Sequence, residues 1–151
     1  MENLLAFKPE SDQLQIIKPS PGLTLAYSAA CNCVLAKWEG FVTKKMLIGG
    51  ANHALKLLTK TQCPNLLVDH RSIHGTWPDI TDWQQNIWLP NAVRAGLKKY
   101  AHVACSGSYS VMTAEHLFSR INGMVELMIF SELDDATLWL RSGLEDPALN
   151  N

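Results

Sequence analysis

Apolar residues change their spacing along the chain, and this change separates predicted strands from predicted helices. Residues 23–28 and 33–40 are β-prone and flank a short polar gap, which predicts a hairpin. From Thr43 onward, apolar residues recur at steps of three and four, which predicts a helix with Thr43 as its N-terminal cap. Gly49 and Gly50 interrupt this helix at a cost of about 1 kcal/mol each relative to alanine. We therefore expect the helix either to pack closely at the glycine pair or to kink there.

A short apolar run over residues 65–69 comes next and ends on a polar residue, as expected of an interior strand. A polar loop over residues 69–76 is predicted to follow it, and then a tryptophan-rich helix that Pro90 kinks or restarts. The apolar spacing of this helix predicts an inward face of Ile80, Trp83 and Ile87.

The rest of the chain alternates strictly between strand and helix. Strands are predicted at 100–105 and 124–130, and helices at about 111–121, with Ser110 as the cap, and from a capping box near 131 to about 141. The order β-β-α-β-α-β-α-β-α predicts an α/β fold with a mostly parallel central sheet of four to five strands flanked by helices.

The same pattern predicts one domain. Residues 1–22 carry three prolines and read as an N-terminal leader, with at most one short edge strand. Residues 23–141 form the predicted domain, and residues 142–151 form a C-terminal tail. A domain of this size buries enough surface to fold without a disulfide or a metal ion, and no cofactor is predicted.

Composition narrows the class of partner. The chain has 13 basic and 14 acidic residues and a net charge of −1, so it lacks the basic excess that nucleic-acid binding requires. No apolar run approaches the roughly 20 residues that span a bilayer, and the N-terminus does not resemble a signal peptide. We therefore predict a cytoplasmic protein with no transmembrane segment, whose four cysteines are reduced.

Several short stretches together resemble the STAS-like group often labelled SpoIIAA-like, which is related in fold to STAS anti-sigma-factor antagonists and is compared with CRAL-TRIO lipid-transfer domains. The resemblance covers about residues 23–141 and implies a bacterial STAS-like domain with a four- or five-stranded sheet flanked by helices. The stretches that carry it are Lys37-Trp38-Glu39-Gly40, Leu67-Val68-Asp69, the helix from Trp83 through Trp88 to Leu89-Pro90, residues 96–103, and residues 130–140.

The chain departs from this family at one position. Conventional STAS antagonists carry a phosphorylatable serine or threonine at the start of the helix after the corresponding strand, in an Asp-Ser-Ser-Gly-like context. This chain has Asp69-His70-Arg71-Ser72 there, and Ser72 matches in position alone. The residues around Ser72 therefore lack the sequence context in which the family is phosphorylated.

In α/β folds, ligands bind at the loops that follow the carboxyl ends of the strands. Asp69 and Arg71 lie in one such predicted loop, where the guanidinium fork could orient an anionic ligand or the carboxylate could simply hold the loop while Arg71 faces solvent. Ser72 and Ser108 are candidates for ligand contact or nucleophilic chemistry, although neither lies in a Gly-x-Ser-x-Gly elbow. Turn or cap roles explain both serines more simply.

His70 and His74 are weak candidates for metal binding. Their four-residue spacing would let both bind one ion only if they lay in a helix, and no third strong ligand is nearby in the sequence. Trp77 and Trp88 are the tryptophans predicted to lie at a pocket rim or partner surface, since Trp88 falls outside the inward stripe of its helix.

These observations favour a non-enzymatic, regulatory STAS-like protein that binds a protein partner or a small ligand. One alternative is a carrier of an apolar or lipid-like ligand, and another is a metal-dependent or serine hydrolase centred on residues 69–76. An uncovered edge strand in the opening hairpin also favours a homodimer.

Overall fold

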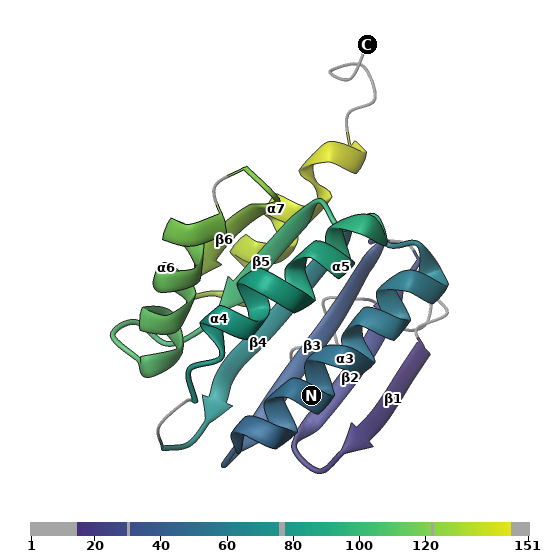
Figure 1. The fold of residues 1–151 in the computed structure, drawn as a ribbon. Helices are drawn as coiled ribbons and strands as arrows, with labels where there is room; N and C mark the ends of the chain where they lie inside the picture. The colour runs from purple at the N-terminus through teal and green to yellow at the C-terminus, as the bar shows by residue number, and fades with distance from the viewer. Residues whose placement is uncertain (1–14, 30, 76–77, 122, 146–151) are drawn as a thin grey trace.

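The computed structural model describes residues 15–29, 31–75, 78–121 and 123–145, and strand and helix alternate along it as predicted (Figure 1). A π-helical turn, η1, links two short α-helices in the middle of the chain. In chain order the elements are β1 (Gln15–Ser20), β2 (Leu23–Ser28), β3 (Cys33–Gly40), α3 (Lys44–Thr61), β4 (Asn65–Ile73), α4 (Thr81–Trp83), η1 (Gln84–Trp88), α5 (Leu89–Arg94), β5 (Lys99–Val103), α6 (Tyr109–Ile121), β6 (Glu126–Phe130) and α7 (Leu133–Glu145).

Within the described ranges, the sheet has six strands in the order β1-β2-β3-β4-β5-β6. The pairs β1–β2 and β2–β3 are antiparallel, whereas β3–β4, β4–β5 and β5–β6 are parallel. The expected α/β class, the mostly parallel sheet and the opening hairpin are therefore confirmed. The strand number of four to five was too low, because the leader contributes β1 as an additional antiparallel edge strand.

Helices cover the two faces of the sheet unequally. Figure 1 shows α3, the α4–η1–α5 segment and α6 on one face, with α7 on the other. The larger core cluster fills the first interface and includes Leu58, Leu66 and Leu89, all at most 1% exposed. The smaller cluster, with Leu67 and Ala136, lies under α7. The first face, which three helical segments cover, holds the site described below.

Helix α3 shows why its glycine pair is tolerated. The Thr43 hydroxyl accepts a hydrogen bond from the Met46 amide at 3.1 Å, which confirms the predicted cap. A Cβ added to Gly50 would lie 2.4 Å from the Trp38 ring, whereas one added to Gly49 would meet nothing within 4 Å. The helix therefore packs closely against β3 at Gly50.

The helix after β4 departs from the predicted period. Its middle turn, η1, is π-helical and so contains an additional residue relative to an α-helical turn. This rotates the inward face by one position, so that Ile87 is 53% exposed and Trp88 only 3% exposed. The predictions of an inward Ile87 and of Trp88 at a rim are both wrong for this reason.

The four cysteines lie among the described residues as free thiols. Cys31, Cys33 and Cys63 are buried and Cys105 is exposed. Burial raises the pKa of Cys63 to about 11 and also raises that of Cys33. In the described part of the chain, no helix is long and apolar enough to cross a bilayer.

Candidate functional site

Strand β4 extends further than the sequence indicated. It runs to Ile73, so Asp69, His70, Arg71 and Ser72 are strand residues and the predicted loop over them is wrong. The pairing with β3 continues to the end of β4 through an irregular register, in which Lys37 faces Asp69 and Glu39 faces Ser72. Because these residues lie in a strand, neighbouring residues of β4 point to opposite faces of the sheet.

Asp69 and Arg71 form a partly buried ion pair on the α7 face. Asp69 is 1% exposed, and its carboxylate accepts hydrogen bonds from Arg71 Nε and Nη2, each at 3.0 Å, and from the Arg71 amide at 3.1 Å. These bonds raise the pKa of Arg71 above its usual value. The pair therefore fixes the end of β4, and it holds Arg71 against the protein rather than in solvent.

The opposite face of β4 carries a cluster of three buried polar side chains. Ser110 Oγ on α6 lies 2.6 Å from His70 Nδ1 and 2.7 Å from His102 Nε2 on β5. The two imidazole rings meet edge to face with their centroids 4.5 Å apart. All three residues are at most 6% exposed. One hydroxyl group thus joins two neighbouring strands and a helix.

Burial keeps both histidines of this cluster neutral near pH 7. It lowers the pKa of His102 to about 4, opposed in part by a hydrogen bond with the backbone of Ser110 and by the charge of Asp69. Burial also lowers the pKa of His70, and the neighbouring His102 lowers it further. The second ring nitrogen of His102, Nδ1, is buried without a hydrogen-bond partner among the described residues. The hydrogen-bonding capacity of His102 Nδ1 is therefore available to a ligand.

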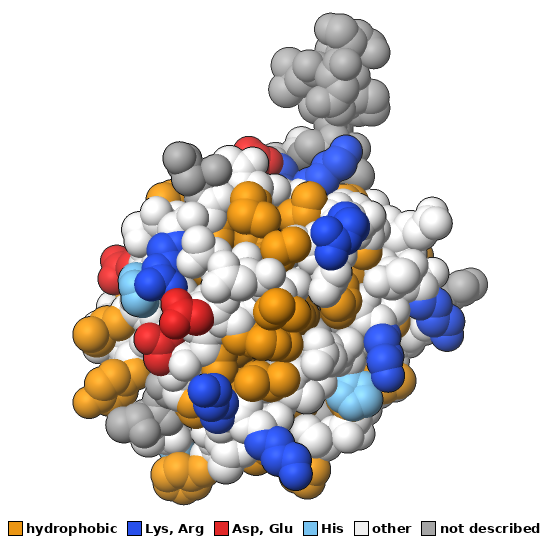
Figure 2. Space-filling model, in the orientation of Figure 1, with side chains coloured by type: hydrophobic (Ala, Val, Ile, Leu, Met, Phe, Trp, Pro, Cys, Tyr) orange, Lys and Arg blue, Asp and Glu red, His pale blue; other side chains and the backbone are white. Residues whose placement is uncertain are grey.

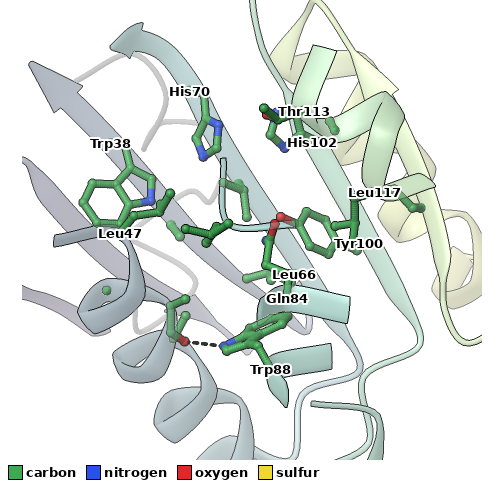
Figure 3. A pocket seen from close by; sticks show the side chains of 18 residues that line it. Trp38, Leu47, Leu66, His70, Gln84, Trp88, Tyr100, His102, Thr113 and Leu117 are labelled. Carbon is green, nitrogen blue, oxygen red and sulfur yellow. Dashed lines mark hydrogen bonds between the residues drawn. The ribbon is translucent and has the colours of Figure 1, made fainter. Parts of the chain in front are cut away.

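A cavity of about 50 Å³ adjoins this cluster, between the sheet and the covering helices (Figure 3). Its walls are mainly apolar, with Leu66 and Val68 on the sheet and Ala114 and Leu117 on α6. Figure 3 shows His70 and His102 side by side at one end of the cavity, with Trp88 at the other. Its polar lining groups come from His70, Gln84, Tyr100, His102 and Thr113, together with the indole of Trp38 and Trp88.

The π-helical turn positions two of these residues. Trp88 donates its indole N–H to the backbone carbonyl of Ala51 on α3 at 2.7 Å. Gln84 is hydrogen bonded to the Tyr100 hydroxyl, whose pKa burial raises to about 12. Since π-helical turns often occur at functional sites, the placement of η1 against this cavity is consistent with a binding role.

Unlike the cavity wall, the outer surface of the covering helices carries charged as well as hydrophobic side chains. Figure 2 shows hydrophobic side chains gathered between α3 and the α4–α5 segment, with Lys and Arg side chains around them and acidic side chains near α4. Lys44, Lys45, Lys56 and Lys60 all belong to α3, which contains no acidic residue. Of the residues that the structure describes, no Asp, Glu, Lys or Arg lines the cavity itself.

The remaining predicted site residues do not join this cavity. The Ser108 hydroxyl accepts from the Val111 amide at 3.2 Å, so Ser108 caps α6 in place of the predicted Ser110. Ser72 is half-buried near the end of β4, and His74 is exposed beside Phe41, with ring centroids 6.1 Å apart. Trp77 lies outside the described residues.

Buried histidines beside a serine can take part in metal binding or in nucleophilic catalysis. The described residues contain no group of three His, Cys, Asp or Glu side chains arranged to hold a metal ion. Ser110 and His102 resemble the nucleophile and base of a hydrolase in their 2.7 Å contact. In a triad, however, an acid holds the other ring nitrogen, and here His102 Nδ1 contacts no acid among the described residues. Among the described residues, the serine–histidine contact is therefore present without the orienting acid of a triad.

His70 was predicted only as a weak metal-binding candidate. The sequence pattern did not predict pocket roles for His102, Ser110, Gln84 and Tyr100. One signal was available, because Tyr100 and His102 are two apart in a predicted buried strand and so share a face. A polar residue on such a face needs a partner. The partner of His102 is Ser110, which the sequence pattern had indicated to be a helix cap instead.

Comparison of the chain with protein-family models, curated proteins and solved structures found no match.

Proposed function

We propose that this protein is a non-enzymatic binding module that holds a small molecule, or the end group of a larger one, in the cavity beside His70 and His102. The observation that carries the proposal is a mainly apolar cavity whose wall includes a few polar groups, with His70 and His102 side by side at one end. Ligand sites commonly combine a mostly apolar lining with a small number of placed polar groups. The resemblance of the sequence to STAS-like domains supports the non-enzymatic assignment.

The size of the cavity bears on the alternative of a lipid carrier. An engineered cavity that binds benzene measures about 150 Å³. The cavity described here is about 50 Å³, so an acyl chain does not fit within it. We therefore favour a small ligand over an apolar carrier function.

Native mass spectrometry tests the proposal on full-length protein purified from the cells that make it naturally. Ala114→Leu fills the cavity from α6, because Ala114 lines it. Ala136→Leu is the matched control, since Ala136 is a fully buried helical alanine in the core under α7. We expect a small-molecule adduct on the wild type and on Ala136→Leu, and its loss from Ala114→Leu. A wild-type protein without any adduct, or an adduct that Ala114→Leu retains, contradicts the proposal.

A further inference from the structure

The number of protons in the His70–Ser110–His102 cluster constrains what the cavity can bind. Ser110 Oγ makes short contacts to a nitrogen of each histidine, at 2.6 and 2.7 Å. A hydroxyl has one proton to donate and two lone pairs that accept, so Ser110 donates at most one of these contacts. With both rings neutral, two arrangements are possible at His102: its Nε2 accepts from Ser110, or its Nε2–H donates to Ser110.

These two arrangements give His102 opposite properties at Nδ1. When His102 donates from Nε2 to Ser110, its Nδ1 is an acceptor. When Ser110 donates to Nε2, the proton of His102 lies on Nδ1, which is then a donor. Rotation of one hydroxyl, with the matching tautomer change, therefore converts the atom from acceptor to donor without a change in net charge.

The surroundings of Nδ1 select for an uncharged partner. Among the described residues, no Asp, Glu, Lys or Arg lines the cavity, and desolvation lowers the pKa of both histidines. The charge that acts on His102 is that of the Asp69 carboxylate, which is already paired with Arg71. An ion that enters an apolar site without a counter-charge loses far more solvation than a neutral polar group does. A volume of about 50 Å³ holds about four non-hydrogen atoms, taking 10–15 Å³ for each water-sized group.

We propose that the cavity binds a neutral polar group of about four non-hydrogen atoms, of the amide class, which pairs with His102 Nδ1. The inference rests on the function proposed above and adds the chemical class of its ligand. An amide both donates and accepts hydrogen bonds. It can therefore pair with His102 in either tautomeric arrangement.

Three probes of equal size test the class: acetamide, acetate and acetamidinium. Titration of full-length protein labelled with nitrogen-15, followed by the imidazole nitrogen signals, reports both affinity and the state of His102. We expect acetamide to bind in the millimolar range and to shift the His102 Nδ1 signal, and both ions to bind at least tenfold more weakly. Equal or tighter binding of either ion overturns the assignment of a neutral ligand.

A variant separates pairing with Nδ1 from simple filling of the cavity. His102→Gln keeps a nitrogen where Nε2 contacts Ser110 and removes Nδ1, so we expect acetamide affinity to fall about tenfold, equivalent to about 1.4 kcal/mol. His53→Gln, on the exposed side of α3, should bind as the wild type does. An unchanged acetamide affinity in His102→Gln overturns the inference. Should that variant not fold, an Nδ1 signal that acetamide leaves unmoved in the wild type overturns it equally.

The two proposals fail in different ways. If acetate or acetamidinium binds as tightly as acetamide and Ala114→Leu blocks that binding, the cavity is a ligand site and only the neutral class is wrong. If neither these probes nor xenon binds and native mass spectrometry finds no adduct, the binding function itself is wrong.

Discussion

Acidification from pH 7 to pH 5 should destabilise the fold through its buried histidines. Burial lowers the pKa of His102 from 6.5 to about 4, and it lowers that of His70 in the same direction. In the unfolded chain both imidazoles return to ordinary values and take up protons near pH 6.5. The stability that their neutral forms allow is therefore complete above pH 6.5 and decreases as the pH falls toward the folded-state pKa values.

The magnitude for His102 follows from the separation of its two pKa values. Each pKa unit corresponds to 1.36 kcal/mol, so a fall from 6.5 to about 4 corresponds to about 3 kcal/mol once the pH is below 4. About 2 kcal/mol of this is lost between pH 7 and pH 5. His70 adds a loss of the same sign. Most carboxyl groups titrate below this interval, so the histidines dominate it.

Urea unfolding monitored by tryptophan fluorescence at pH 7, 6 and 5 measures this effect. The wild type should lose about 2 kcal/mol or more over the interval, and His102→Gln should lose about 2 kcal/mol less than the wild type. His53→Gln is the control, because its side chain is exposed on α3, and it should follow the wild type. A free energy of unfolding that does not change with pH, or equal pH dependence in the wild type and His102→Gln, refutes the reasoning.

Two further predictions concern packing and helix geometry. Gly50→Ala should destabilise the fold by about 1–3 kcal/mol, because its Cβ meets the Trp38 ring. Gly49→Ala, whose Cβ meets nothing, should stabilise the fold by up to about 1 kcal/mol. Chemical denaturation measures both, and equal effects of the two variants would contradict the close approach at Gly50. Trp88→Ala should cost about 3–5 kcal/mol and Ile87→Ala less than about 1 kcal/mol, and the reverse order would contradict the π-helical turn.

The order of elements could be predicted from the sequence because it depends on local periodicity. Each of the strands β2, β3 and β4 can be recognised from its own residues. The first two are β-prone runs and the third is an apolar run. The additional strand β1 was harder to assign, because it is exposed over most of its length and contains Pro19. Its place in the sheet depends on pairing with β2 rather than on its own apolar pattern.

The candidate site could be predicted only in part, because its contacts join distant segments. His70 and Ser110 are 40 residues apart, and nothing local to either residue indicates that they meet. Asp69 and Arg71 resembled loop residues because they are polar, yet their ion pair allows both to lie in a strand. The π-helical turn moved Trp88 into the cavity by one position, a shift that apolar spacing does not reveal.

The positions of the cysteines allow thiol reactivity to report local opening of the structure. Cys105 is exposed, while Cys33 and Cys63 belong to cores on opposite faces of the sheet. A thiol reagent in excess should therefore modify one site quickly and the buried sites only as fast as the structure opens. Mass-resolved labelling of Cys33 and Cys63 would show whether both sides of the sheet open together or one before the other.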